Sequence, residues 1–383
     1  MTDLSELTAA TAHLDPPLVA LDAVALRTNG ADLVRRASGT PVRVASKSVR
    51  CRTVLDLVLA TPGFAGVMGY SVREAIWLAR NGVRDVLLGY PSADRSALAD
   101  LAADPALVEA ITLMADSTEQ LALARAAAGD VALRVCLDVD ASLRIRRMHL
   151  GVRRSPVRTP ADAAGLAQAA RAQGFRVVGV MFYEAQIAGL PDSSPAVRLV
   201  KRRSASELAR RRGAVVDAVQ AVVGELEIVN SGGTGSLEVS SADPVVTEVT
   251  AGSGLFVPTL FDNYRAFEAR PALYFALPVV RRPAPRIATL FGGGYIASGP
   301  AGKSRLPRPV ERGLTLLGTE GAGEVQTPVR GAAAGALHVG DRVWFRHAKA
   351  GELCERFDTV HVVEGGKITE SVPTYRGEGK TFG

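Results

Sequence analysis

The sequence predicts an α/β protein with a (β/α)8 TIM-like barrel and a second, smaller antiparallel β-domain. The length of the chain and two patterns along it lead to this expectation. The 383 residues exceed what one small domain needs and suit one large barrel plus a smaller module. Apolar runs alternate with helical segments as far as Arg265, and beyond it short apolar runs are separated by turns.

Eight apolar runs of strand length are spaced along the first part of the chain. They lie at residues 42–46, 65–68, 85–88, 111–114, 131–139, 177–182, 226–229 and 245–249. Helical segments rich in Ala, Leu and Arg separate most of them, at 50–60, 71–80, 94–103, 117–128, 160–173 and 204–223. This alternation is typical of parallel βαβ units, and runs that are apolar throughout indicate strands buried on both faces. Eight such units predict a closed barrel of about 250 residues.

The pattern changes after Arg265. Short apolar or alternating runs follow at 273–281, 286–291, 314–317, 342–346 and 359–363. Gly, Pro and charged turns separate them, which is typical of an antiparallel β-domain. We therefore place the barrel at residues 18–268, with a short strand at 18–22, and the β-domain at residues 1–17 and 269–383.

Composition excludes several classes of protein. Hydrophobic residues make up 47% of the chain, yet no apolar run reaches the ~18 residues of a membrane span. The first 15 residues are acidic and lack the pattern of a secretory signal, so we expect a cytoplasmic protein. Cys51, Cys136 and Cys354 are odd in number and far apart, which argues against a disulfide framework and against a zinc site built from cysteines.

The net charge of +6 is the feature that could point to nucleic acid. Arginines are scattered, however, and aromatic residues make up only 5% of the chain, so no stacking platform is available. A preference for small anionic molecules is the simpler interpretation.

Lys47 is the leading candidate for chemistry. It directly follows the run at 42–46, and α/β barrels keep catalytic groups at the carboxyl ends of their strands. A lysine amine becomes nucleophilic when burial or cationic neighbours favour its neutral form, and Arg43 and Arg50 are close in sequence. A surface lysine at a strand end is the alternative.

Two glycine-rich loops favour a catalytic role for Lys47 over that of a surface lysine. The seventh and eighth predicted strands are followed by Ser231, Gly232, Gly233, Thr234 and Gly235, and by Thr250, Gly252 and Ser253. Glycines let backbone N–H groups converge on an anion and hydroxyls add donors, so each loop could bind phosphate. Phosphate sites in α/β barrels recur at these two positions. Either loop alone is a weak signal, because flexible glycine-rich turns are common, but two such loops at the expected strand ends together with Lys47 are a considerably stronger one.

Other strand ends carry further candidates. Tyr183, after the sixth strand, could bond to or stack on a ring held between Lys47 and the phosphate loops, or be a rim aromatic. Asp138 and Asp140, after the fifth, could orient the site or lie solvated at the rim. The arginines between 144 and 154 form mostly a solvated face, from which one could hold a substrate carboxylate.

In their order and spacing these motifs resemble the alanine-racemase-like, fold-type III pyridoxal-phosphate enzymes. Within them they resemble the branch of D-threonine aldolases and D-serine dehydratases (amino acid deaminase/aldolase). The matching segments cover most of the chain: 21–22 with Asn29, 44–47, 138–140 with 151–152, 180–184, 231–235 and 247–253. No single segment is specific, but their order and spacing together are.

The resemblance implies a function. Lys47 would form an aldimine with pyridoxal 5′-phosphate (PLP), Tyr183 and His347 would act in catalysis, and the two loops would bind the cofactor. The implied reaction is that of a lyase or aldolase on a D-configured β-hydroxy amino acid, D-threonine- or D-serine-like, with the cofactor accepting charge from Cα. A racemase or decarboxylase on the same scaffold is one alternative. A non-catalytic PLP-binding protein is another, against which the β-domain counts.

Two departures from that family leave parts of the site open. At Thr250 many relatives carry an arginine that faces the ring nitrogen. Many relatives also follow the histidine, two residues on, with a Cys or Asp that helps to bind a divalent ion, whereas here His347 is followed by Lys349. Cys354 or Asp358 could supply a displaced ligand for zinc or manganese. Lys349 could instead replace the ion, and the broken spacing favours this metal-free version.

Family precedent also implies a homodimer. Tyr264, Phe267 and Tyr274, near the junction of the two predicted domains, are apolar material that such an interface could use.

Overall fold

The computed structural model describes residues 4–192, 194–265, 267–268 and 270–382. The chain forms two compact units. One comprises Met1–Ala31, Lys47–Leu57 and Gly252–Thr381, and the other Asp32–Ser46, Val58–Ala251 and Phe382–Gly383. We call them the sheet unit and the barrel unit.

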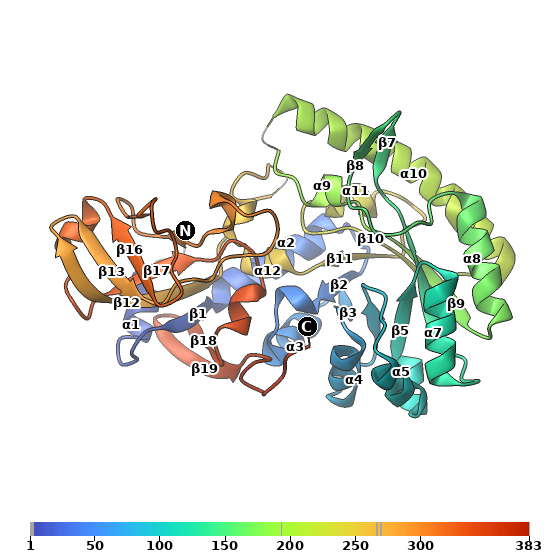
Figure 1. Ribbon diagram of the computed structural model, residues 1–383, viewed down its shortest axis with the longest axis horizontal. Coiled ribbons are helices and arrows are strands. Elements are labelled where there is room, and N and C mark those ends of the chain that lie inside the picture. Colours follow the sequence, from blue (N-terminus) through green and yellow to red (C-terminus); the bar gives the residue numbers. More distant parts are fainter. Residues whose placement is uncertain (1–3, 193, 266, 269, 383) are drawn as a thin grey trace. The chain divides into compact units, whose positions relative to one another are not determined.

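The barrel unit contains the predicted closed parallel barrel, which the structure confirms (Figure 1). Its strands follow one another around the barrel in the order β10-β11-β2-β3-β4-β5-β6-β9. Their bounds are β2 Val42–Ala45, β3 Phe64–Gly69, β4 Val86–Leu88, β5 Ile111–Ala115, β6 Arg134–Val139, β9 Arg176–Phe182, β10 Ile228–Ser231 and β11 Glu248–Ala251. Most of these strands are buried along their whole length, which is why they stand out as continuous apolar runs.

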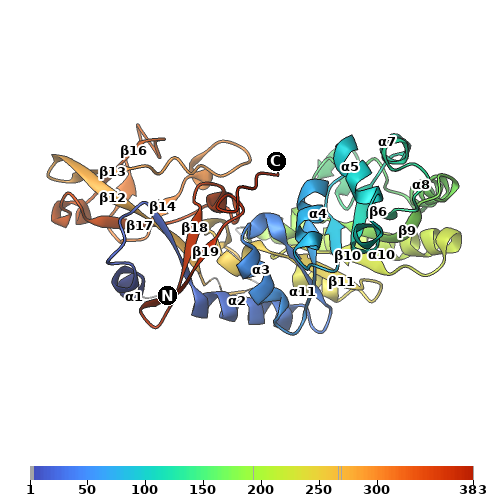
Figure 2. The same cartoon turned by 90° about the horizontal axis from the view of Figure 1, so that it is seen from below.

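Helices connect the strands and surround the barrel (Figures 1 and 2). The helices of the chain are α1 Leu4–Ala10, α2 Ala23–Arg36, α3 Arg52–Leu59, α4 Val72–Arg80, α5 Arg95–Ala102, α6 Pro105–Ala110, α7 Thr118–Ala128, α8 Pro160–Ala172, α9 Ala185–Ala188, α10 Pro195–Val223, α11 Leu237–Ser241 and α12 Ser253–Phe256. Local sequence defines their starts: Ser71 and Ser117 cap α4 and α7, and Thr159 forms a capping box with Asp162 at α8. Among the described residues, no helix has both the length and the apolar character that crossing a bilayer requires.

Two features of the barrel unit differ from the expectation. The helix expected at 204–223 begins at Pro195, because the Ser194 side chain caps it and a proline suits the first helical turn. The connection from β6 to α8 carries an antiparallel hairpin, β7 (Leu143–Ile145) and β8 (Met148–Leu150), whose strands of three residues each are too short to give a strand signal.

The sheet unit contains the second, mainly antiparallel sheet, which confirms the predicted β-domain fold. Seven strands lie in the order β15-β16-β13-β12-β1-β18-β19, while β17 pairs with β12 and β14. Their bounds are β1 Leu18–Asp22, β12 Leu273–Ala284, β13 Ile287–Phe291, β14 Arg308–Pro309, β15 Thr315–Leu316, β16 Gln326–Arg330, β17 Arg342–Arg346, β18 Thr359–Glu364 and β19 Lys367–Pro373.

β1 lies within this sheet, between antiparallel β12 and parallel β18. The sheet unit therefore includes residues 18–22, which the sequence assigns to the barrel domain, and it begins again at Gly252 rather than at 269. A short apolar strand does not reveal its partners, and those of β1 are supplied from the far end of the chain.

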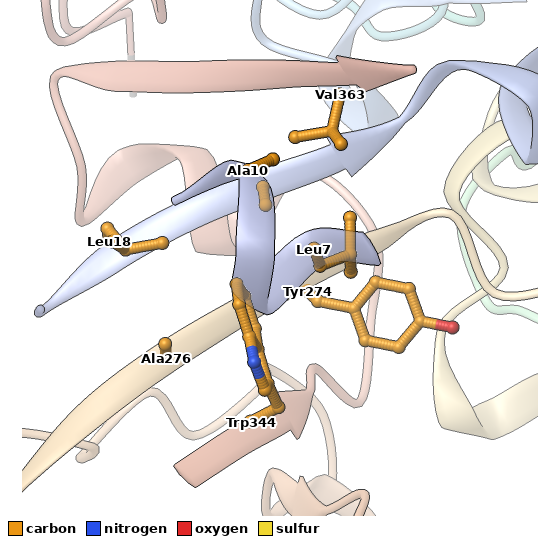
Figure 3. Packing of buried hydrophobic residues seen from close by; sticks show 8 residues of the cluster. Leu7, Ala10, Leu18, Tyr274, Ala276, Trp344 and Val363 are labelled. Carbon is orange, nitrogen blue, oxygen red and sulfur yellow. The ribbon is translucent and has the colours of Figure 1, made fainter. Parts of the chain in front are cut away.

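Helix α1 packs against this sheet (Figure 3). Leu7 and Ala10 of the helix meet Leu18, Tyr274 and Trp344 in one buried cluster, in which Figure 3 also labels Ala276 and Val363. The indole Nε1 of Trp344 donates a hydrogen bond of 2.9 Å to Thr8 Oγ1. Burying an aromatic ring while satisfying its N–H fixes the position of α1 on the sheet.

Candidate active site

The barrel unit brings most of the predicted cofactor-binding residues to one rim. Because all eight strands are parallel, their carboxyl ends lie at the same end of the barrel. Tyr183 is the first residue after β9, Ser231 ends β10, and Thr250 lies near the end of β11. Lys47, in the turn Ser46–Ser48 that follows β2, leaves the barrel at this same end.

Glu184, to which sequence reasoning gave no role, organises the first glycine-rich loop. Its side chain is fully buried and accepts hydrogen bonds from Ser231 Oγ (2.9 Å), the Gly232 N–H (3.2 Å), Ser236 Oγ (2.6 Å) and Ser240 Oγ (2.6 Å). A buried carboxylate needs such partners to offset the loss of water. The loop is therefore tied to the residue next to Tyr183.

Arg212, on α10, also contacts this loop. Its guanidinium pairs with Asp243, donates to Ser231 Oγ at 2.9 Å, and lies 5.4 Å from the centre of the Phe182 ring. The Ser231 hydroxyl is thus engaged by groups of the protein, so its observed part is to shape the loop.

Two glycines of this loop are required by its geometry. Gly232 has a φ of +98°, which a residue with a side chain rarely adopts. A Cβ at Gly233 would lie 2.8 Å from the Cβ of Ala188. The backbone at Gly232 and Gly233 therefore stays bare, as the close approach of an anion requires. Thr234 and Gly235 follow in the turn that leads to α11.

Thr250 belongs to a polar network between neighbouring strands. Asn230 Nδ2 donates to Thr250 Oγ1 and to Glu248 Oε1, both at 2.8 Å. Arg43 then pairs with Glu248 (2.6 Å) and Asp85 (2.8 Å). Because its oxygen accepts from Asn230, the Thr250 hydroxyl keeps its own proton for another acceptor. Arg43 is neutralised by two carboxylates, so it does not act as the cationic neighbour expected for Lys47.

Asp138, at the end of β6, is a carboxyl group that changes charge near neutral pH. Its pKa is raised to about 7, chiefly by burial and then by the charge of the nearby Asp116, while Arg154 acts in the opposite direction. The Arg154 guanidinium lies over the rings of Tyr183 (5.2 Å) and Tyr90 (5.5 Å). A carboxyl with this pKa at a barrel rim suits proton transfer.

Asp140, two residues on, has a different environment. Burial alone would raise its pKa, but hydrogen bonds from Ser142 and the charges of Arg144 and Arg158 hold that pKa below its usual value. Asp140 thus anchors the base of the β7–β8 hairpin. The motif Asp-x-Asp was visible in the sequence, but the different roles of its two carboxyls depend on the fold.

The sheet unit contains Lys47, Gly252, Ser253 and His347. Gly252 and Ser253 form the start of α12. At Gly351, a Cβ would lie 1.9 Å from the carbonyl oxygen of Lys47, so the turn at 351 packs directly on the backbone of that lysine. Arg50 forms a salt bridge of 3.0 Å with Glu355, which extends this contact.

His347 is buried, with 2% of its surface exposed. Burial and, to a lesser extent, Arg346 lower its pKa to about 3, so it is neutral at pH 7. Neither ring nitrogen has a hydrogen bond of good geometry within the described residues, although the Leu273 backbone is close.

The donor set around His347 does not fit a divalent ion. Cys354 is buried and burial raises the pKa of its thiol, while Asp358 is exposed and pairs with Arg376 at 2.9 Å. Among the residues that the structure describes, no three His, Cys, Asp or Glu side chains gather as metal ligands would. Lys349, at the second position of the motif, donates to Ser298 Oγ at 3.0 Å.

Comparisons with known proteins identify the fold. No family model and no curated protein matches the chain. Among solved structures, D-threonine aldolase from Filomicrobium marinum is similar with a TM-score of 0.80 and 22% identity, covering 96% of each chain. D-threo-3-hydroxyaspartate dehydratase from Delftia sp. HT23 has a TM-score of 0.74 and 20% identity, over 94% of this chain and 97% of that chain.

An alanine-racemase-like protein from Idiomarina loihiensis is also similar, with a TM-score of 0.72 and 15% identity over 95% of this chain and 97% of that chain. Alanine racemase from Clostridium difficile has a TM-score of 0.65. The chain therefore has the fold shared by D-threonine aldolase, D-threo-3-hydroxyaspartate dehydratase and the alanine-racemase-like proteins.

Proposed function

We propose that this protein is a PLP-dependent lyase or aldolase that acts on D-configured β-hydroxy amino acids. The observation that carries the proposal is the rim of the barrel. There a lysine directly follows β2, and a glycine-rich loop after β10 is fixed by the buried Glu184. The fold shared with an aldolase and a dehydratase for such substrates supports the choice of reaction.

In this proposal, Lys47 binds the cofactor covalently through its amine. The loop from Gly232 to Gly235 and the segment at Gly252 and Ser253 would hold the phosphate, for which the bare backbone of Gly232, at positive φ, is suited. Bound PLP supplies an electron sink for charge that develops at the substrate Cα. Tyr183 would hydrogen-bond to or stack on the cofactor ring.

We propose that Thr250 and Asp138 determine which protons the site can donate and accept. Thr250 offers a neutral hydroxyl to the ring nitrogen, held in place by Asn230. Asp138 can give or take a proton near pH 7 because burial keeps its carboxyl largely protonated below that pH. His347 remains neutral and, on this reading, hydrogen-bonds the substrate rather than carrying charge.

Racemisation or decarboxylation on the same scaffold is the second candidate. Racemases are among the similar structures, but their TM-scores, 0.58 to 0.65, are lower than the 0.80 of D-threonine aldolase. A PLP-binding protein without turnover is the third candidate.

Product analysis tests the choice of reaction. Purified protein loaded with PLP is incubated with D-threonine, D-serine and their L-enantiomers. We expect glycine and acetaldehyde from D-threonine, or a keto acid and ammonia from D-serine. Formation of the opposite enantiomer would instead establish a racemase, and PLP uptake without any product would leave only the carrier.

The attachment point is tested separately. Borohydride reduction of the loaded protein followed by peptide mass spectrometry should place the cofactor on Lys47. Lys47→Ala should lose both the bound cofactor and activity, whereas Lys303→Ala, which changes an exposed lysine, should lose neither. Label on another lysine would overturn the assignment.

We further propose a cytoplasmic homodimer. Cys51, Cys136 and Cys354 are all buried and form no disulfide, which suits a reducing compartment. Phe261, Tyr264 and Phe267 form a cluster of rings with centroids 5.0 to 5.7 Å apart that could contribute to a dimer interface. Light scattering after size exclusion that gives the mass of one chain, 40.1 kDa, would remove the dimer.

A further inference from the structure

The sheet unit has an open cavity of about 510 Å³ between the end of α1 and the β18–β19 hairpin. Its volume falls within the ~300–1,000 Å³ typical of small-molecule sites. None of the residues proposed for catalysis or for PLP binding lines it, so the proposed function gives this cavity no role. The apolar part of its lining consists of Ala9, Ala10, Leu14 and Ile368.

The polar part of the lining contains bases and hydrogen-bond donors. It consists of His13 after α1, His361 on β18, and Lys367 and Ser371 on β19. Among the described residues that line the cavity, none is an Asp or a Glu. A cavity that combines an ammonium group and two imidazoles with no carboxylate attracts anions.

His361 is held in a defined orientation. It lies opposite Ser371 in the register of the hairpin, and its Nδ1 is hydrogen-bonded to Ser371 Oγ at 2.8 Å. When the hydroxyl donates to Nδ1, the ring carries its proton on Nε2 and can donate it to a ligand. Burial and the nearby His13 lower the pKa of His361, so the two imidazoles are close enough to act on one ligand.

Lys367 has no salt-bridge partner in the part of the chain that the structure describes. Glu364 lies opposite it in the hairpin register, but the two oxygens of Glu364 accept from Arg27 at 2.5 and 3.0 Å. Glu370 is one residue before Ser371 on β19, so its side chain lies on the other face of the hairpin. The positive charge of Lys367 at the cavity is therefore left for a ligand.

We propose that this cavity binds a small organic anion. The carboxylate or phosphate group of the ligand contacts Lys367 and His361, and its short apolar part contacts Leu14 and Ile368. The ammonium supplies charge, and the imidazole and hydroxyl groups supply directed hydrogen bonds. The inference is independent of the proposed function, because the cavity contains none of the residues on which that function depends.

An NMR titration of the full-length, PLP-loaded protein tests the site. The histidine rings are isotopically labelled, and the resonances of His13 and His361 are assigned as those lost in His13→Gln and His361→Gln. The probes are butyrate and methyl phosphate, which carry a short apolar group, and inorganic sulfate, which does not. We expect butyrate or methyl phosphate to shift both resonances with a saturable Kd of ~1 mM, and the tighter of the two identifies the charged group. The exposed His338 should not shift.

Lys367→Met removes the charge and should weaken binding of that probe ~10- to 100-fold. Lys303→Met is the matched control, because Lys303 is an exposed lysine of the same unit that does not line the cavity. It should bind as the wild type does. Thermal melts of both variants should match the wild type, since both side chains are exposed. His361→Gln should also weaken binding, so the result does not depend on one variant.

Three results would overturn the proposal. The first is shifts that stay linear up to ~50 mM of both organic probes, which would mean that no site is filled. The second is equal affinity in the wild type and in Lys367→Met. The third is sulfate binding as tightly as the organic probes, which would mean that the apolar lining contributes nothing to recognition.

Discussion

Gly351→Ala tests whether the turn at 351 positions Lys47. The new Cβ would lie 1.9 Å from the Lys47 carbonyl oxygen and 2.8 Å from its carbonyl carbon, and both are backbone atoms that cannot rotate away. Relief of this overlap requires the two segments to separate by roughly 1 Å. Lys47 is the proposed point of cofactor attachment, and a displacement of that size at a reacting group costs about 100-fold in rate. We expect kcat to fall by about that factor.

Gly340→Ala separates this effect from backbone strain. Gly340 has a φ of +97°, close to the +86° of Gly351, but nothing lies within 4 Å of its Cβ position. Both variants bear the ~1–2 kcal/mol cost of a side chain at positive φ, and only Gly351→Ala also disturbs Lys47. Thermal melts measure the shared cost, and turnover together with borohydride labelling of Lys47 measures the specific one. Equal losses of turnover in the two variants would refute the reasoning.

Three further changes test other parts of the structure. Glu184→Gln places an amide among hydroxyl and N–H donors, so we expect urea denaturation to show a free energy of unfolding lowered by ~2–4 kcal/mol, together with weaker PLP binding. An unchanged affinity for PLP would contradict the role of Glu184 in the loop. Asp138 has a folded-state pKa of about 7, above the unfolded ~3.9, so the native state holds its proton between these values and wild-type stability falls as pH rises through that window. Asp138→Asn removes this dependence, so in melts at graded pH its free energy of unfolding should rise relative to that of the wild type by up to roughly 4 kcal/mol by pH 7. A difference between the two proteins that stays the same at every pH would refute the assigned pKa. Asn29→Ala leaves the carbonyls of Leu255 and Arg270 without their shared donor and should lower the unfolding free energy by ~1–3 kcal/mol, against little change for the exposed Asn81→Ala.

The barrel could be predicted from sequence because its strands carry a strong local signal. Each of the eight predicted runs overlaps one observed barrel strand, since parallel strands covered on both faces must be apolar throughout. The partners of β1 could not be predicted, because alternation within five residues contains no information about strands more than 250 residues away. The hairpin β7–β8 could not be predicted because each of its strands has only three residues.

The same distinction applies to the candidate site: some of its residues could be predicted from their position along the chain, and others depend on contacts made only in the folded protein. Lys47, Tyr183 and the glycines of the first loop could be proposed from their positions at strand ends. Glu184 could not, because its importance lies in hydroxyl and N–H partners supplied by a segment about 50 residues further on. The raised pKa of Asp138 likewise depends on burial and on Asp116, which only the folded chain brings close.

The position of β1 constrains the order in which the chain can fold as it is synthesised. β1 leaves the ribosome before its neighbours β12 and β18, which begin only at Leu273 and Thr359. Until they emerge, its backbone donors and acceptors have no strand to pair with, whereas the barrel strands are complete at Ala251. The barrel unit can therefore fold first, while β1 is still without its partner strands. A chain that stops before Thr359 leaves one edge of β1 open, and such nascent or truncated chains are the species most exposed to strand-mediated aggregation.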